Sequence, residues 1–218
     1  SGWRETQYNK VLAWKKAVEQ NMGEVIICCD VDIQFIGDSK TFFEHIIGDK
    51  DIAFQQNFRG GPICSGFFVC RCSLKTQNFF EIIANRLKKI MHEDGGGEQY
   101  EMQQLLSEKW YELNVLKLSY DKVWCPGVEY KSLKDLNVPK DMLVHHANWT
   151  EGLENKVEQL EYIKSNTNIF DYCAGVKIKG DWTFFESNIK DGKHVEEPLQ
   201  KTIRYYIFST IKYFYFFI

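Results

Sequence analysis

The sequence lacks an excess of basic residues, a long apolar run and a paired cysteine motif. Lys and Arg total 27 against 30 Asp and Glu, so no polybasic surface for nucleic acid is expected. No segment reaches the about 18 uninterrupted apolar residues that a transmembrane helix needs. The first ten residues, SGWRETQYNK, also lack the apolar region of a signal peptide. We therefore expect a cytoplasmic chain that has no transmembrane segment and does not bind nucleic acid.

The cysteines do not suggest disulfide bonds. They are odd in number, seven, and none is spaced as CxxC. Cys28 and Cys29 lie in one apolar run, and Cys70 and Cys72 in another. Small buried thiols in a reducing compartment explain these positions better than bridges do.

Apolar residues are plentiful, and their spacing predicts alternating helices and strands. With 44% hydrophobic residues in 218, the chain can bury a sizeable core. Hydrophobic periodicity and glycine positions predict helices over 5–21, 41–47, 74–91, 97–110 and 151–165, and strands over 25–29, 51–57, 63–73, 113–119 and 142–148, with Gly66 interrupting the third strand. This alternation predicts an α/β domain over residues 1–165, a sheet with helices on both faces, followed by an extension of different character over 166–218.

Two carboxylates follow the first strand directly, in the stretch VIICCDVDIQF. If Val25–Cys29 is a central strand, Asp30 and Asp32 lie at its carboxyl end, where open α/β sheets bind ligands. Residues i and i+2 of an extended backbone point to the same side, so both could face one hard cation or one phosphate group. The alternative is that the strand simply ends and the acids are solvated.

Two histidines end a later strand, in the stretch HHANWTEGLENK that starts at His145. Imidazole is the usual nitrogen ligand of Mn²⁺ or Zn²⁺, and a strand end can place it beside a distant carboxylate pair. Taken alone, a histidine here is more often structural.

Five motifs in order resemble the nucleotide-diphospho-sugar transferase family: DVD at 30–32, DIAFQQN at 51–57, CSGFFVCR at 64–71, GEQ at 97–99 and HANWTEGLENK at 146–156. These are GT-A-fold glycosyltransferases, with a Rossmann-like mixed sheet, of plants, algae and some large DNA viruses. The resemblance covers residues 8 to about 160. It implies that Asp30, Asp32 and His146 bind a divalent metal, Mn²⁺ or Mg²⁺, and that Lys156 contacts the donor diphosphate. The further residues it implies in donor or acceptor binding are Val31, Gln55, Gln56, Asn57, Ser65, Gly66, Gln99, Asn148 and Gly152.

The implied activity is transfer of a hexose or pentose from a nucleoside diphosphate sugar, taken to be a UDP-sugar, to a glycan or glycoprotein hydroxyl. A metal and a lysine would stabilise the charge that develops on the leaving diphosphate. Glu98 or Asp51 could take the acceptor proton or stabilise the cationic sugar. For Glu98 the alternative has equal weight, because an acidic residue after three glycines can merely favour the first turn of a helix.

The sequence departs from the family in two places. GT-A domains begin with a strand-helix-strand unit that holds the nucleoside, whereas here DVD follows one helix and one strand, which indicates a fragment. If the whole protein has an upstream anchor, the Golgi lumen replaces the cytoplasm as its location. The extension, whose end is IRYYIFSTIKYFYFFI, aligns with no family motif. We expect these last residues, 203–218, to dock on the domain or on a second copy in a homodimer.

Two other functions remain open at this stage. Haloacid-dehalogenase-like phosphatases also place DxD after an apolar strand, but they usually continue with x-Thr or x-Val, whereas Ile33 and Gln34 follow here. A non-catalytic sugar-nucleotide-binding or oligomerising module derived from a transferase is the second alternative.

Overall fold

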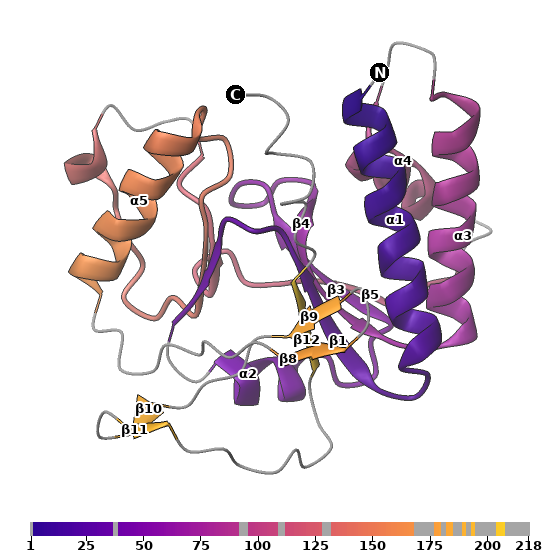
Figure 1. Ribbon diagram of the computed structural model, residues 1–218, viewed down its shortest axis with the longest axis horizontal. Helices are drawn as coiled ribbons and strands as arrows, with labels where there is room; N and C mark the ends of the chain where they lie inside the picture. Colours follow the sequence, from indigo (N-terminus) through magenta and orange to yellow (C-terminus); the bar gives the residue numbers. More distant parts are fainter. Residues whose placement is uncertain are drawn as a thin grey trace.

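The computed structural model describes residues 2–36, 39–91, 96–108, 112–127 and 132–167, together with the backbone of five short strands beyond residue 176. Its main element is a five-stranded mixed sheet with the order β12-β1-β4-β3-β5 (Figure 1). The strands are β1 (Val25–Cys29), β3 (Ile52–Gln56), β4 (Ile63–Arg71), β5 (Val115–Lys117) and β12 (Arg204–Ile207). β4 is antiparallel to both β1 and β3, whereas β12 runs parallel to β1 and β5 parallel to β3.

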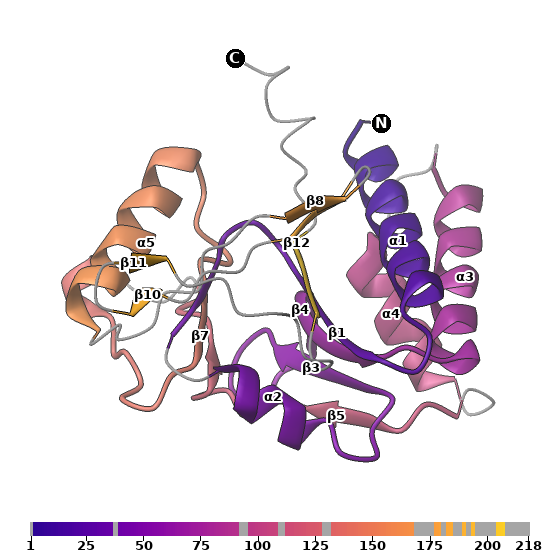
Figure 2. The same cartoon turned by 60° about the horizontal axis from the view of Figure 1, so that its bottom comes forward.

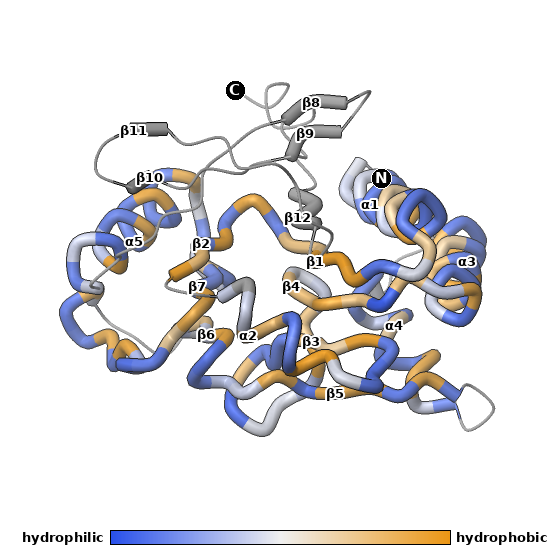
Figure 3. The backbone as a smooth tube through the Cα atoms, turned by 90° about the horizontal axis from the view of Figure 1, so that it is seen from below, coloured by the Kyte–Doolittle hydropathy of each residue, from blue (hydrophilic) through white to orange (hydrophobic). Residues whose placement is uncertain are grey.

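Helices cover both faces of this sheet, as the sequence predicts (Figure 2). One face carries α1 (Gly2–Gln20), α3 (Leu74–Lys89) and α4 (Glu98–Ser107), and the opposite face carries α2 (Ser39–Ile46). Successive residues of a strand point to opposite faces, so Ile26 of β1 belongs to the core under α1 and α3 while Ile27 packs with Phe43 of α2. In Figure 3 the tube through β1 and β3 is mostly hydrophobic, whereas the outer helices α1 and α3 mix hydrophilic and hydrophobic residues.

A second sheet, with the order β2-β7-β6, lies beside the first. It is formed by β2 (Ile33–Phe35), β6 (Val123–Trp124) and β7 (Val144–His146), and the short helix η1 (Leu133–Asp135) lies between β6 and β7 in the chain. Helix α5 (Leu153–Asn166) packs against this sheet, where Gln34 Nε2 donates to Leu160 O at 2.9 Å. The chain crosses from the first sheet to the second between β1 and β2, through residues 30–32.

The helices and strands predicted for residues 1–165 are found, but the structure differs at Gly66 and contains three short elements that were not predicted, β2, β6 and η1. β4 continues through Gly66, but its pairing with β3 shifts there, because Phe54 lies opposite Phe68 while Gln55 lies opposite Cys64. β6 was not predicted, since a two-residue strand is too short to show a periodicity.

The extension contributes the antiparallel pairs β8 (Lys177–Lys179) with β9 (Trp182–Phe184) and β10 (Ile189–Lys190) with β11 (Lys193–His194), besides β12. Residues 208–218 of the tail that we expect to dock lie outside the described part of the chain. Within that part, all six cysteines are buried and free. None of the helices described there combines the length and apolar character that crossing a membrane requires.

Candidate active site

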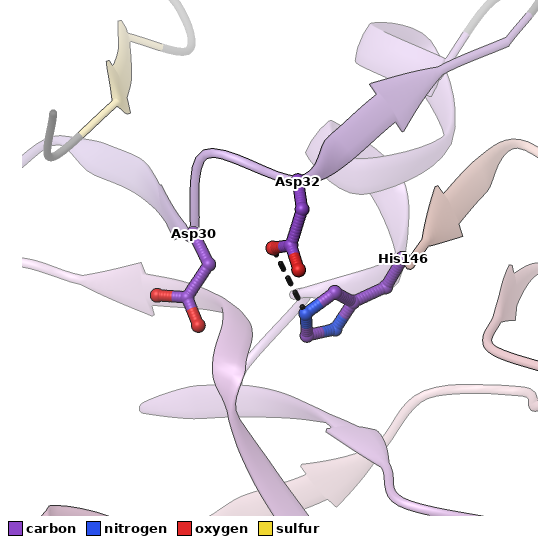
Figure 4. Close-up of side chains that lie close together, drawn as sticks. All are labelled: Asp30, Asp32 and His146. Atoms are coloured by element: carbon purple, nitrogen blue, oxygen red, sulfur yellow. Dashed lines mark ion pairs between the residues drawn. The ribbon is translucent and has the colours of Figure 1, made fainter. Parts of the chain in front are cut away.

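Asp30 and Asp32 lie where the chain passes between the two sheets. They do not share one extended strand, as the sequence suggested, because β1 ends at Cys29 and residues 31 and 32 form a turn. The turn nevertheless brings both carboxylates to His146 of β7. One ligand atom from each of the three side chains lies within 4.8 Å of the others, and Figure 4 shows the three side chains facing a common space.

Gly66 of β4 leaves the room that this group needs. Asp30 N donates to Gly66 O at 2.8 Å, so the first aspartate is held against the strand at this residue. A Cβ atom at position 66 would lie 2.4 Å from His146 Cε1 and 2.9 Å from Asp30 Oδ2. Because real Cβ contacts are not that short, any side chain here would displace the histidine or the carboxylate.

His146 is oriented by a buried amide. Its Nδ1 donates to Gln55 Oε1 at 2.8 Å, which leaves Nε2 pointing at Asp32 Oδ1, 3.3 Å away. Burial lowers the pKa of His146, but the hydrogen bonds to Asp32 and Cys64 outweigh it and raise the pKa to about 10. Burial raises the pKa of Asp32, but the hydrogen bonds and positive charges of His146 and Lys156 outweigh it. They hold the pKa of Asp32 well below its usual range. A divalent cation could replace the proton that lies between His146 Nε2 and Asp32. Two carboxylates and an imidazole with a fixed tautomer are a common set of metal ligands.

A lysine already neutralises each aspartate. Lys156 of α5 forms an ion pair with Asp32 Oδ2. Lys10 of α1 lies with Nζ 2.6 Å from Asp30 Oδ1, and it also contacts Glu98 Oε1 at 3.1 Å. Burial alone would lower the pKa of Lys10, yet its two carboxylate partners raise it above its ordinary value, so the ammonium stays charged.

Lys10 was not predicted as a site residue. It is one of several lysines on an amphipathic helix and belongs to no local motif, so its sequence position carries no signal. Only the packing of α1 beside β1 places it at Asp30.

Glu98, Ser65 and Gln99 come together beside Lys10. Ser65 Oγ donates to Glu98 Oε1 at 3.0 Å, and Ser65 N donates to Gln99 Oε1 at 3.1 Å. Glu98 is the first residue of α4, and its side chain is nevertheless almost fully buried in this network. The structure therefore gives Glu98 both the helix-start position and a place in the site.

The structure places several predicted residues close to the group without direct contact with it. Asn57 Oδ1 accepts from Asn148 Nδ2 at 3.4 Å, which ties the end of β3 to the loop after β7. Gly152, which has φ of 83°, is the N-cap residue before α5, and its carbonyl oxygen accepts from Lys156 N. Val31 is 47% exposed between the two aspartates.

Gln56 and Asp51 are held by other parts of the chain. Gln56 Nε2 donates to Leu118 O at 2.7 Å, which fixes the amide toward β5. Asp51 lies at the opposite end of β3, where its carboxylate pairs with Lys75 and accepts from Asn114 N at 2.7 Å. The structure does not bring Asp51 to the group at His146.

The neighbouring His145 points to the other face of the second sheet. Its Nδ1 donates to Gln34 Oε1 and its Nε2 accepts from Gln159 Nε2, both at 2.9 Å. Burial and the charge of His146 lower its pKa to about 3, so the ring is neutral. Of the two adjacent histidines, His145 has the structural role and His146 faces the aspartates.

Comparisons with known proteins identify the family and the fold. Residues 3–160 match the family described as nucleotide-diphospho-sugar transferase. The fold is similar to the crystal structure of a glycosyltransferase involved in the glycosylation of the major capsid of PBCV-1, with a TM-score of 0.52 and 13% sequence identity over 74% of this chain and 77% of that chain. A search among curated proteins found no match.

Proposed function

The chain belongs to the nucleotide-diphospho-sugar transferase family, and we propose that it is a metal-dependent glycosyltransferase that moves a sugar from a UDP-sugar to a hydroxyl of a glycan or glycoprotein. The observation that carries the metal dependence is the convergence of Asp30, Asp32 and His146 within 4.8 Å. The family match weighs against the phosphatase alternative, which also leaves the HANWTEG stretch unexplained.

The donor set favours Mn²⁺ over Mg²⁺. Mg²⁺ prefers oxygen ligands and octahedral geometry, whereas an imidazole nitrogen suits later divalent metals. The orienting bond from His146 to Gln55 is the kind of outer contact that tunes a metal-binding histidine. When bound, the cation would neutralise the diphosphate and stabilise it as a leaving group.

Lys156, Gly66 and Gln55 surround the three candidate metal ligands. Lys156 now neutralises Asp32, and a bound cation at Asp32 would free the ammonium to contact a diphosphate oxygen. Gly66 leaves room for His146 and Asp30, whose side chains occupy the space beside its Cα atom. Gln55 Nε2 is fully buried without a conventional hydrogen-bond partner within the described residues, so a sugar hydroxyl could reach it only if the side chains around it move.

Glu98 fits the role of a positioning residue better than that of a base. Its Oε1 already accepts from Lys10 Nζ and Ser65 Oγ, so that oxygen is not open to a substrate proton. In this role it holds Lys10 beside Asp30 and Ser65 beside the donor sugar.

The test is binding and turnover on the same preparations. We expect MnCl₂ with UDP to raise the melting temperature, and Asp32→Ala to abolish that rise while Asp141→Ala, at an aspartate whose side chain is 80% exposed, keeps it. UDP-sugars should be hydrolysed slowly by the wild type, less by Lys156→Ala, and not by His146→Ala, with the exposed His45→Ala as control.

The outcomes separate the alternatives. An unchanged melting shift in Asp32→Ala would exclude the metal site. Binding of UDP and Mn²⁺ without hydrolysis or transfer of any UDP-sugar would instead support the non-catalytic module.

A further inference from the structure

A hollow of about 290 Å³ opens at the edge of the second sheet, outside the group at Asp30 and Asp32. Its wall includes Arg59, from the loop after β3, and its floor includes Trp124 of β6, which is only 5% exposed. Asp135 of the short helix η1 and Asn137, which follows that helix, also line the hollow. The volume is close to the lower limit of the roughly 300–1,000 Å³ of small-ligand sites.

The polar wall of the hollow is held in place before any ligand binds. Arg59 Nη1 donates to Asp121 Oδ2 at 2.9 Å, and Nη2 pairs with the other oxygen of the same carboxylate. The guanidinium also lies 5.1 Å from the centroid of the Tyr120 ring. Tyr120 in turn donates its hydroxyl proton to Cys125 O, which fixes the ring. Bidentate pairing and stacking restrict the arginine to one orientation.

The chemistry of the lining selects a neutral, hydroxyl-bearing ligand. Among the described residues of the lining, the charged side chains are Arg59, Asp121 and Asp135, so carboxylates there outnumber the one guanidinium, which is already paired. A phosphate or sulfate would meet net repulsion here. Carboxylates and the Asn137 amide hydrogen-bond hydroxyl groups, while the aromatic rings supply apolar surface with a polar tip. Sugar rings present both kinds of surface.

The hollow and the metal-type group (Asp30, Asp32 and His146) lie on different faces of the second sheet. Trp124 pairs in register with His145 and packs against its ring, with the ring centroids 5.6 Å apart, whereas His146 faces the aspartates. A glycan in the hollow would therefore bind independently of the metal-type group.

We propose that this hollow binds one sugar unit of a neutral glycan, as an anchoring site separate from the metal-type group. The inference rests on the proposed glycosyl transfer, but its binding step does not require a metal or a donor. Asp121 and Asn137 would hydrogen-bond the hydroxyls, and Tyr120 would contact the apolar face of the ring.

The experiment is binding of the full chain to an array of neutral, sulfated and phosphorylated oligosaccharides, followed by titration of the strongest neutral binder by saturation-transfer NMR. We expect neutral glycans to bind the wild type, and Asp121→Asn and Arg59→Ala to weaken them about tenfold or more. The control Asp141→Asn, at an exposed aspartate outside the hollow, should bind like the wild type.

Two further measurements keep this proposal separate from the proposed activity. Asp121→Asn should retain the melting shift with MnCl₂ and UDP, and Asp32→Ala should lose that shift yet still bind the glycan. The proposal would be overturned if no neutral glycan binds, if anionic glycans bind more tightly, or if the Asp121 and Arg59 variants bind with the affinity of the wild type. These outcomes do not depend on the result at the metal-type group.

Discussion

Lys10 Nζ lies 2.6 Å from Asp30 Oδ1, so a helix at the start of the chain supplies the counter-ion of a carboxylate in the candidate metal group. Lys156 does the same for Asp32 from the other side of the group. The two aspartates are thus neutralised by two lysines in the absence of any ligand. A divalent cation must compete with these lysines, whereas a cation together with a diphosphate gives each lysine a new partner.

The first prediction concerns the stability that Lys10 provides. Lys10→Met leaves Glu98, whose side chain is 8% exposed, without its cation. We expect the free energy of unfolding in urea to fall by about 2–3 kcal/mol. Lys10→Met combined with Glu98→Gln should recover part of the loss, because the buried charge is removed. Lys16→Met, at an exposed lysine of the same helix, is the control, and equal stability of the two single variants would show that Lys10 contributes nothing.

The second prediction is that metal and nucleotide bind cooperatively. Mn²⁺, measured by its EPR signal, should bind weakly alone and about tenfold more tightly in the presence of UDP. Lys156→Met should bind Mn²⁺ alone more tightly than the wild type, since Asp32 loses its competing cation, and should show a smaller gain with UDP. Independent binding of Mn²⁺ and UDP in the wild type would contradict the argument.

A methyl group at position 66 should disrupt the group at His146. Gly66→Ala places a Cβ 2.4 Å from His146 Cε1, so we expect the melting shift with MnCl₂ and UDP to be lost. Circular dichroism should still show a folded protein. The matched control is Gly61→Ala, whose added methyl would meet only the ring of Phe58, which is 58% exposed and free to move aside. A normal melting shift in Gly66→Ala would mean that the histidine is not a ligand.

The pH dependence of stability should reveal the neutral state of His145. Its pKa is about 3 in the folded protein, below the ordinary value near 6.5, so between these values the unfolded state binds more protons. Stability contributed by this group is therefore lost as pH falls from about 6.5, by up to about 1.4 kcal/mol per pH unit. Urea unfolding of His145→Gln should show a smaller slope between pH 6.5 and 5. The control His45→Gln should keep the wild-type slope.

The last prediction concerns the extension, which we propose belongs to the same folding unit. β12 pairs in parallel with β1 over four residues, Arg204–Ile207. Deleting residues 203–218 should lower the melting temperature and expose dye-binding apolar surface in a monomeric protein. Conversion of a dimer to a monomer in light scattering would instead indicate docking between chains. Unchanged stability and mass would exclude both.

The local elements and the family could be predicted from the sequence. Hydrophobic periods and glycine positions are local signals, so the strand Val25–Cys29 and the helices around it could be predicted without contacts. Asp30, Asp32 and His146 could be selected because each follows or ends an apolar strand, and ordered motifs connect them with one family. Such signals depend only on residues that are neighbours in the chain.

Which side chains meet depends on packing between distant parts of the chain. Glu98 and Asp51 were equal candidates by residue type, but packing of α1 against α4 brings Glu98 to Lys10, while Asp51 is carried to the far end of β3. Lys10 and Asp30 are separated by a helix and a strand, and no sequence pattern records that these return to the same place. The ionisation of His145 and His146 was likewise beyond the sequence, because adjacent residues of one strand face opposite sides and therefore different surroundings.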